Sequence, residues 1–278
     1  MRLETSSNPR ILVYDIETGP LPVLTFRLGE QVIRHNQLLP GMEINPIICI
    51  AYSWVGESKV HLLTWDPETR DQTEMIKEFD KVIAQADIVI GKNNIRFDDK
   101  WINTHRLLTG NKAYPEWVYK SEDLEQQMRR VFNFPSHSLD YVAKLLLGVG
   151  KTPMEFDDWK DIFVAGLPWA TSKQKMQGQK AFKKMCSYCK VDVKRTKQVL
   201  DRVKKFLKFK FNTSAFKEIV CCVQPYCGST DIKKNGTSIR NAIAMSGKTK
   251  YQLFHCNEHG GYAGRRPINA KEGTKLTH

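Results

Sequence analysis

Asp15 and Glu17 stand two positions apart at the end of an apolar run that begins at Ile11. Side chains alternate between the two faces of a β-strand, so both carboxylates are predicted to project from the same face as Ile11 and Val13. Two neighbouring carboxylates raise each other's pKa unless a divalent cation neutralises them. The pair therefore indicates half of a metal site, although an isolated pair of this kind is more often a solvated strand end.

A second acidic signal follows another apolar run. Residues 87–90 predict a strand, and Gly91 together with the asparagines after it predicts a turn. Either Asp98 or Asp99 then begins a helix that carries Trp101. The alternative role for this carboxylate is helix capping, because Asp is common at helix N-termini.

The third signal lies in a long basic helix predicted over residues 173–210. Tyr188 and Asp192 are four positions apart, so the hydroxyl and the carboxylate lie on one helical face, one turn from each other. Taken alone, this pair would be an ordinary helix surface.

In this order, the three elements resemble the motifs of the DEDD superfamily of 3′→5′ exonucleases, whose fold is ribonuclease H-like. The similarity is greatest to the Tyr-bearing DEDDy branch, which includes the proofreading domains of family B DNA polymerases. It covers roughly residues 10–205. The matching segments are Tyr14–Thr18, Gly91–Asp98, Ser138–Leu146 and Tyr188–Asp192.

The resemblance implies a catalytic site with two Mg²⁺ or Mn²⁺ ions and no organic cofactor. Asp15 would bridge both ions, and Glu17 and Asp192 would complete the first site. Asp98 would hold the second ion, partly through water, and Tyr188 would orient the attacking water. Oxygen ligands of this kind suit magnesium or manganese.

The second motif matches the family pattern at Asp98 but departs from it at Lys92. Asp98 is preferred to Asp99 because it directly follows Phe97, as in the family pattern. Lys92 departs from that pattern, since relatives often have His or Tyr there, and the phosphate contacts at this position stay open.

The C-terminal part has a different metal signature. Cys222 and Cys227 are followed, after 28 intervening residues, by Cys256 and His259. Two such Cys/His knuckles suit one tetrahedral zinc ion. The pattern resembles a zinc ribbon, in which four protein ligands make the metal structural and leave no open catalytic position.

Two further residues, Cys221 and His255, stand beside the preferred zinc ligands and are alternatives to them. Residues 232–236, between the knuckles, predict a strand and a turn. We therefore expect two domains, an exonuclease domain over residues 1–211 and a zinc-ribbon domain over residues 212–278.

The remaining pattern predicts an α/β fold, with a ribonuclease H-like mixed sheet flanked by helices. Residues 47–54 and 59–65 read as strands around a glycine turn, so the sheet opens with three strands that are partly antiparallel. Apolar positions over residues 74–85 recur at helical spacing. Residues 20–45 are rich in proline and predict a loop or short helix near the site.

Composition adds constraints on partners. The 278 residues carry a net charge of +13, which favours a polyanionic partner. Seven cysteines, an odd number, argue against a complete set of intrachain disulfides. No apolar segment approaches the length of a membrane helix and no signal peptide is evident, so no membrane association is expected. We expect a cytoplasmic setting, including that of a phage-encoded protein in its host.

The sequence therefore predicts a 3′→5′ exonuclease acting on DNA, most of all on single strands, in replication or repair. A 3′→5′ exoribonuclease is the first alternative, because four carboxylates do not distinguish ribose from deoxyribose. A nucleic-acid-binding module with a vestigial nuclease is the second. The ribbon would hold single-stranded DNA by charge and stacking, or dock on a polymerase or replication protein.

Overall fold

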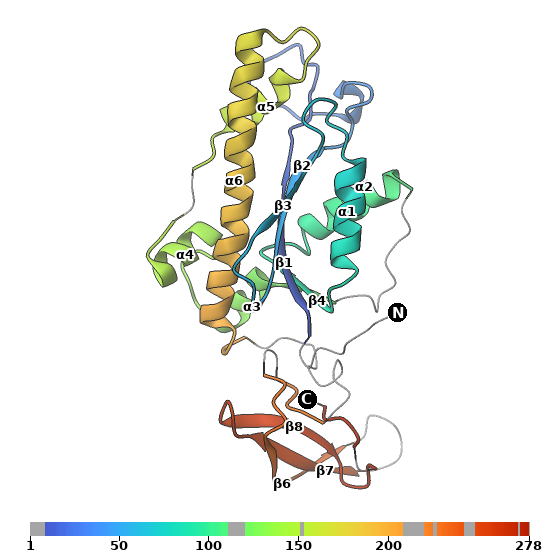
Figure 1. The fold of residues 1–278 in the computed structure, drawn as a ribbon, viewed down its shortest axis with the longest axis vertical. Helices are drawn as coiled ribbons and strands as arrows, with labels where there is room; N and C mark the ends of the chain where they lie inside the picture. Colours follow the sequence, from blue (N-terminus) through green and yellow to red (C-terminus); the bar gives the residue numbers. More distant parts are fainter. Residues whose placement is uncertain are drawn as a thin grey trace.

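The computed structural model describes residues 9–110, 120–150, 153–207, 220–224, 227–241, 248–271 and 273–277. Within these residues, a mixed sheet flanked by helices forms the larger body, and a small antiparallel sheet follows it in the chain (Figure 1).

The larger sheet has the strand order β3-β2-β1-β4-β5. Strand β1 is antiparallel to β2 and parallel to β4, and β5 is parallel to β4. This confirms the predicted α/β fold with a mixed sheet flanked by helices, and the first three strands, predicted to be partly antiparallel, are antiparallel. The strands are β1 (Ile11–Thr18), β2 (Ile47–Trp54), β3 (His61–Thr64), β4 (Ile88–Gly91) and β5 (Lys120–Asp123).

The register of β1 explains why its carboxylates are accessible. Pairing with β4 covers only Ile11 to Val13, whereas pairing with β2 continues to Thr18. The second half of β1, with Asp15 and Glu17, therefore runs past the end of β4. Its edge on that side faces the chain that follows β4.

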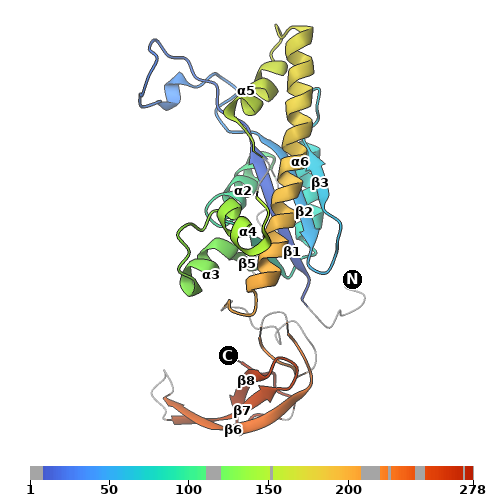
Figure 2. The ribbon, with the colours of Figure 1, turned by 90° about the vertical axis from the view of Figure 1, so that its left-hand side faces the viewer.

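Helices cover both faces of the sheet, with α1 and α2 on one side and α4, α5 and α6 on the other (Figure 1). Helix α6, of 32 residues, packs on β1 and β2 and also along α4 and α5 (Figure 2). The helices are α1 (Thr73–Ile83), α2 (Asp98–Leu108), α3 (Leu124–Val131), α4 (Leu139–Leu147), α5 (Phe156–Ala165) and α6 (Ser172–Val203).

The ends of α6 follow from local sequence. Thr171 and Gln174 form a capping box at its start. The helix ends at Val203, before the predicted end, and residues 208–210 lie outside the described part of the chain. Among the described helices, none combines the length and the apolar character that a bilayer crossing requires.

Residues 20–45 leave the end of β1 as an arm that stands clear of the body (Figure 2). As predicted, the arm is a loop with one short helix, the 3-10 helix η1 (His35–Gln37). A β-bridge between Val23 and Leu38 closes its base, and Phe26 and Leu28 near its tip are fully exposed.

The small sheet has the order β6-β7-β8, from strands β6 (Ile232–Asn241), β7 (Lys248–Cys256) and β8 (Gly261–Pro267). The strand predicted at Ile232 is present, but the predicted turn is wrong: the register shifts between Lys234 and Thr237 and the strand continues. Gly236, with φ of 72°, provides the left-handed residue that this irregularity needs.

Two hydrophobic clusters exist in the described residues. The larger fills the body as far as Leu207, and the smaller begins at Cys222 and includes Phe254 and Leu276. The predicted domain boundary at residues 211 and 212 lies outside the described residues.

Candidate active site and metal centres

Three carboxylates from two elements converge at the end of β1. Asp15 and Glu17 project from the strand, and Asp192 reaches them from α6. One oxygen atom of each lies within 4.8 Å of the others. Three negative charges so close repel one another, and a divalent cation coordinated by oxygen relieves that repulsion. The donor set therefore fits a hard cation such as Mg²⁺ or Mn²⁺.

Asp98 begins α2 and is almost completely buried, with 3% of its surface exposed. Its Oδ1 accepts a hydrogen bond from the Ile16 N–H at 2.9 Å, on the edge of β1 that β4 leaves open beyond Val13. Burial raises the pKa of the Asp98 carboxyl to about 7, and the charges of Asp99 and Asp123 add to this rise while the Ile16 N–H opposes it. A nearby cation would favour the ionised form.

All five residues predicted to be catalytic line one open cleft of about 310 Å³. Tyr188 lies one turn before Asp192 on α6, as its spacing predicts. The predicted set is Asp15, Glu17, Asp98, Tyr188 and Asp192. The rest of the wall is formed by Ile16, Lys92, Asn93, Phe97, Ser138, Leu139 and Asp140.

Asp99, the alternative to Asp98, is not among the residues that line the cleft. Its carboxylate accepts a hydrogen bond from the hydroxyl of Tyr14 and another, at 2.6 Å, from the Ser121 hydroxyl. These contacts join β1, α2 and β5. Asp99 therefore holds strands together, whereas Asp98 faces the cleft.

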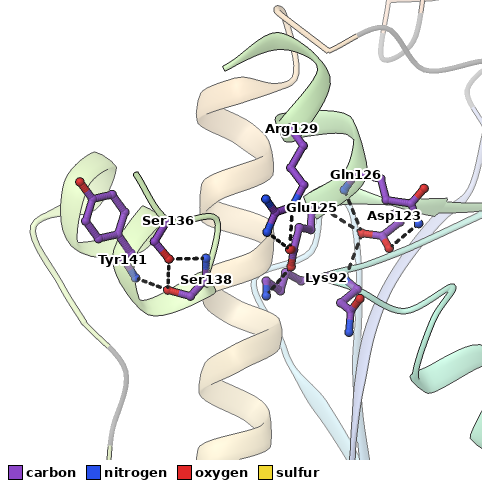
Figure 3. Close-up of polar contacts among 9 residues, drawn as sticks. Lys92, Asp123, Glu125, Gln126, Arg129, Ser136, Ser138 and Tyr141 are labelled. Atoms are coloured by element: carbon purple, nitrogen blue, oxygen red, sulfur yellow. Dashed lines mark hydrogen bonds and ion pairs between the residues drawn. The ribbon is translucent and has the colours of Figure 1, made fainter. Parts of the chain in front are cut away.

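The loop that carries Lys92 is held from α3 (Figure 3). The Lys92 Nζ lies 2.6 Å from a carboxylate oxygen of Glu125, which also pairs with Arg129. Although burial opposes it, hydrogen bonds from Lys92 and Arg129 lower the pKa of Glu125. Asp123 caps α3 and accepts a hydrogen bond from the Asn93 N–H at 3.0 Å, so the same segment fixes both residues of the cleft wall.

Two side chains distant in sequence support the end of β1. Trp159, on α5, donates its indole N–H to the Thr18 carbonyl at 3.1 Å. The Cys189 thiol, on α6, lies 3.5 Å from the Asp15 carbonyl oxygen. Sequence spacing gave no signal for these contacts, since each links residues more than 100 positions apart.

The four preferred zinc ligands also converge. Donor atoms of Cys222, Cys227, Cys256 and His259 all lie within 4.8 Å of one another. Cys227 Sγ is 3.6 Å from Cys256 Sγ, and Cys222 Sγ is 3.1 Å from His259 Nε2. A tetrahedron with zinc–sulfur bonds of about 2.3 Å has edges of about 3.8 Å, so these separations fit a zinc ion.

Backbone hydrogen bonds favour the ionised form of one of these thiols, which is the form that binds a metal. Burial opposes ionisation of Cys256, but the backbone N–H groups of His259 and Glu258 lower its pKa. Burial raises the pKa of Cys222. The alternatives Cys221 and His255 do not belong to the cluster.

No protein family model matches this sequence, and no curated protein matches it. Among solved structures, the chain is similar to the family B DNA polymerase from the hyperthermophilic archaeon Pyrobaculum calidifontis, with 13% sequence identity and a TM-score of 0.48. The similarity covers 70% of this chain and 24% of the polymerase chain. This chain therefore spans about a quarter of that protein, and a similarity this remote assigns no activity.

Proposed function

We propose that this protein is a metal-dependent 3′→5′ exonuclease that hydrolyses phosphodiester bonds from the 3′ end of DNA. The observation that carries the proposal is the meeting of Asp15, Glu17, Asp98, Tyr188 and Asp192 in one cleft. These residues come from three separate parts of the chain, and all of them were predicted from motif order. The direction of cleavage rests on the resemblance to DEDDy exonucleases.

The carboxylates have distinct roles in this proposal. Asp15, Glu17 and Asp192 would hold one Mg²⁺ or Mn²⁺ ion, and Asp98, which lines the same cleft, would hold a second together with Asp15. When bound, two such ions would supply a water that is nucleophilic at neutral pH, neutralise the phosphoryl oxygens and stabilise the leaving 3′ oxygen. The Ile16 N–H fixes the orientation of Asp98 before any ion binds.

Other residues of the cleft act on the water and the strand. The Tyr188 hydroxyl orients the attacking water from the face of α6 that also presents Asp192. Lys92 lies at the cleft wall and shares the carboxylate of Glu125 with Arg129, so this group of three keeps one net positive charge beside the path of a substrate phosphate. Charge that is already in position stabilises the transition state without further reorganisation.

The position of the carboxylates favours an unpaired 3′ end. They line one cleft of about 310 Å³ together with Tyr188. The scissile 3′ nucleotide must separate from a paired base to bring its phosphate to these carboxylates. We therefore propose single-stranded DNA as the preferred substrate.

The C-terminal unit acts as a zinc ribbon in this proposal. Cys222, Cys227, Cys256 and His259 use all four positions of a tetrahedral ion, so the zinc is structural. The ribbon either holds the strand outside the cleft or docks on a polymerase or replication protein.

The test is hydrolysis of matched single-stranded DNA and RNA that carry a label at the 5′ end. With Mg²⁺ or Mn²⁺ we expect a ladder of DNA products shortened from the 3′ end, and none with chelator or with Asp15→Asn. A 3′-terminal phosphorothioate should delay the ladder. Preferential RNA cleavage would favour an exoribonuclease, and no cleavage of either polymer would favour a binding module with a vestigial nuclease.

A further inference from the structure

The lysines of α6 fall into two groups, except that the exposed Lys175 belongs to neither. Some are bound internally: Lys184 pairs with Asp158 at 2.6 Å. Lys197 donates to the Ser53 hydroxyl at 2.6 Å and to the carbonyls of Trp54 and Glu57, so it closes the turn after β2. These lysines hold the body together and are not available to a partner.

The second group is exposed, and we call it the lysine stripe. Its members are Lys173, Lys180, Lys183, Lys190 and Lys194. At 3.6 residues per turn, these positions fall within roughly a third of the helix circumference and extend over about 32 Å of its length. Within the described part of the chain, no carboxylate lies at ion-pair distance from any of them.

The lysine stripe faces away from the sheet. The residues of α6 that pack inward, such as Met185, Cys189 and Val193, lie on the opposite side of the helix. Tyr188 and Asp192 are turned by about 130° from the middle of the stripe, as their helical positions require. The stripe is therefore a surface separate from the cleft.

On two other helices of this protein, lysines are paired with acidic residues of the same helix. Lys77 pairs with Glu74 and Lys81 with Glu78 on α1, and Lys160 pairs with Asp157 on α5, each three positions apart. Acids at such spacings stabilise a helix, whereas like charges at the same spacings repel. The lysine stripe contains two pairs of like-charged neighbours at such spacings, 180/183 and 190/194. A partner that brings negative charge relieves this repulsion.

We propose that the lysine stripe binds the phosphodiester backbone of a nucleic acid outside the active site. The proposal rests on the proposed function in taking the substrate polymer as the partner. A nucleic acid strand is a long, regular polyanion with a charge every 3.4 Å or so, which suits aligned ammonium groups over about 32 Å. Such contacts position a strand without selecting its sequence.

The test compares two variants with the same loss of charge. The stripe variant has Lys180→Gln, Lys183→Gln and Lys194→Gln, and the control has Lys77→Gln, Lys81→Gln and Lys160→Gln. Both are made in the full chain, and binding of a labelled 30-nucleotide single strand is measured without added Mg²⁺ or Mn²⁺ at several salt concentrations. For single strands, each lost phosphate contact reduces the slope of log K against log salt by about 0.7. The slope should therefore fall by about 2 in the stripe variant and stay almost unchanged in the control.

A second readout separates this inference from the exonuclease proposal. With Mg²⁺, the stripe variant should keep the wild-type kcat on a tetranucleotide, which reaches only the cleft, and should show a raised KM on the long strand. If the wild-type protein binds the strand with a steep salt dependence but cuts nothing, the exonuclease proposal is overturned and the stripe inference stands. A stripe variant with the wild-type slope, and a melting temperature that shows it is folded, would overturn the inference and point to an acidic protein as partner.

Discussion

The carboxylate cleft and the Cys/His cluster are both built from four candidate metal ligands, but the chain assembles them in different ways. Asp15 and Asp192 come from opposite ends of the body and meet because α6 packs across β1. The ligands of the proposed zinc ribbon come from two short knuckles in a small unit. One site is open and made of oxygen, and the other is compact and made of sulfur and nitrogen.

The difference lies in what supports each site without a metal. The body buries a large apolar core, and Asp98 and the end of β1 are held by protein contacts from Ile16 and Trp159. The ribbon has only a few buried apolar residues in its described part. Small units of this kind usually depend on a metal for their folding free energy. We therefore expect metal loss to inactivate the cleft but to unfold the ribbon.

The largest expected effect is loss of the ribbon in Cys256→Ser. Structural zinc sites contribute roughly 10–16 kcal/mol of apparent binding free energy, so a ribbon without its metal should not stay folded. Elemental analysis should fall from about one zinc per chain to near zero, and limited proteolysis should remove the C-terminal part. Cys221→Ser is the matched control and should keep its zinc. Equal zinc in both variants would contradict the assigned ligand set.

Asp15→Asn should have the opposite effect: hydrolysis is lost while the zinc and the fold are kept. Loss of one carboxylate ligand should lower hydrolysis about a thousandfold, which corresponds to about 4 kcal/mol of transition-state stabilisation. Zinc content should stay at the wild-type level, and the melting temperature should not fall, because like charges at the cleft are reduced. Asp99→Asn is the comparison, since it affects strand contacts rather than the cleft. If the Asp15 variant keeps wild-type activity in Mg²⁺, the assigned site is wrong.

Lys197→Met should affect the body alone. The ammonium group donates to three oxygens near the β2–β3 turn, and hydrogen bonds to charged groups are worth roughly 1.5–3 kcal/mol each. Burial lowers the pKa of Lys197, so part of this gain is offset by desolvation. We expect a loss of about 2 kcal/mol in chemical denaturation, with zinc content and the salt dependence of strand binding unchanged. A flattened salt dependence would place Lys197 on the strand-binding surface.

The smallest expected effect is that of Tyr188→Phe. It removes one hydroxyl and no metal ligand, so a loss of about tenfold in kcat, or about 1.4 kcal/mol, is expected. Tyr141→Phe, on α4, is the matched control and should show no loss. A Tyr188 variant as active as the wild type would mean that another group orients the water.

Local pattern was enough to predict much of the fold, whereas the five residues of the cleft were selected by the order of motifs in the family resemblance. Apolar runs gave β1 and β2, and the family pattern favoured Asp98, which lines the cleft, over Asp99, which does not. Contacts between distant segments were not predictable. The helical position of Lys197 does not reveal that it turns inward to the β2–β3 turn, and the spacing of Trp159 does not reveal its bond to Thr18. Such partners depend on how helices pack on the sheet.

The most direct test of two independent metal sites is a single sample from which only weakly bound metal is removed. The purified protein is dialysed against metal-free buffer without chelator, its zinc is measured, and cleavage of a 5′-labelled single strand is then recorded before and after addition of Mg²⁺ or Mn²⁺. We predict about one retained zinc per chain, no cleavage after dialysis, and full recovery of cleavage with Mg²⁺ or Mn²⁺. Recovery only with Zn²⁺, or cleavage that persists after dialysis without added metal, would contradict an exchangeable carboxylate site beside a separate structural zinc.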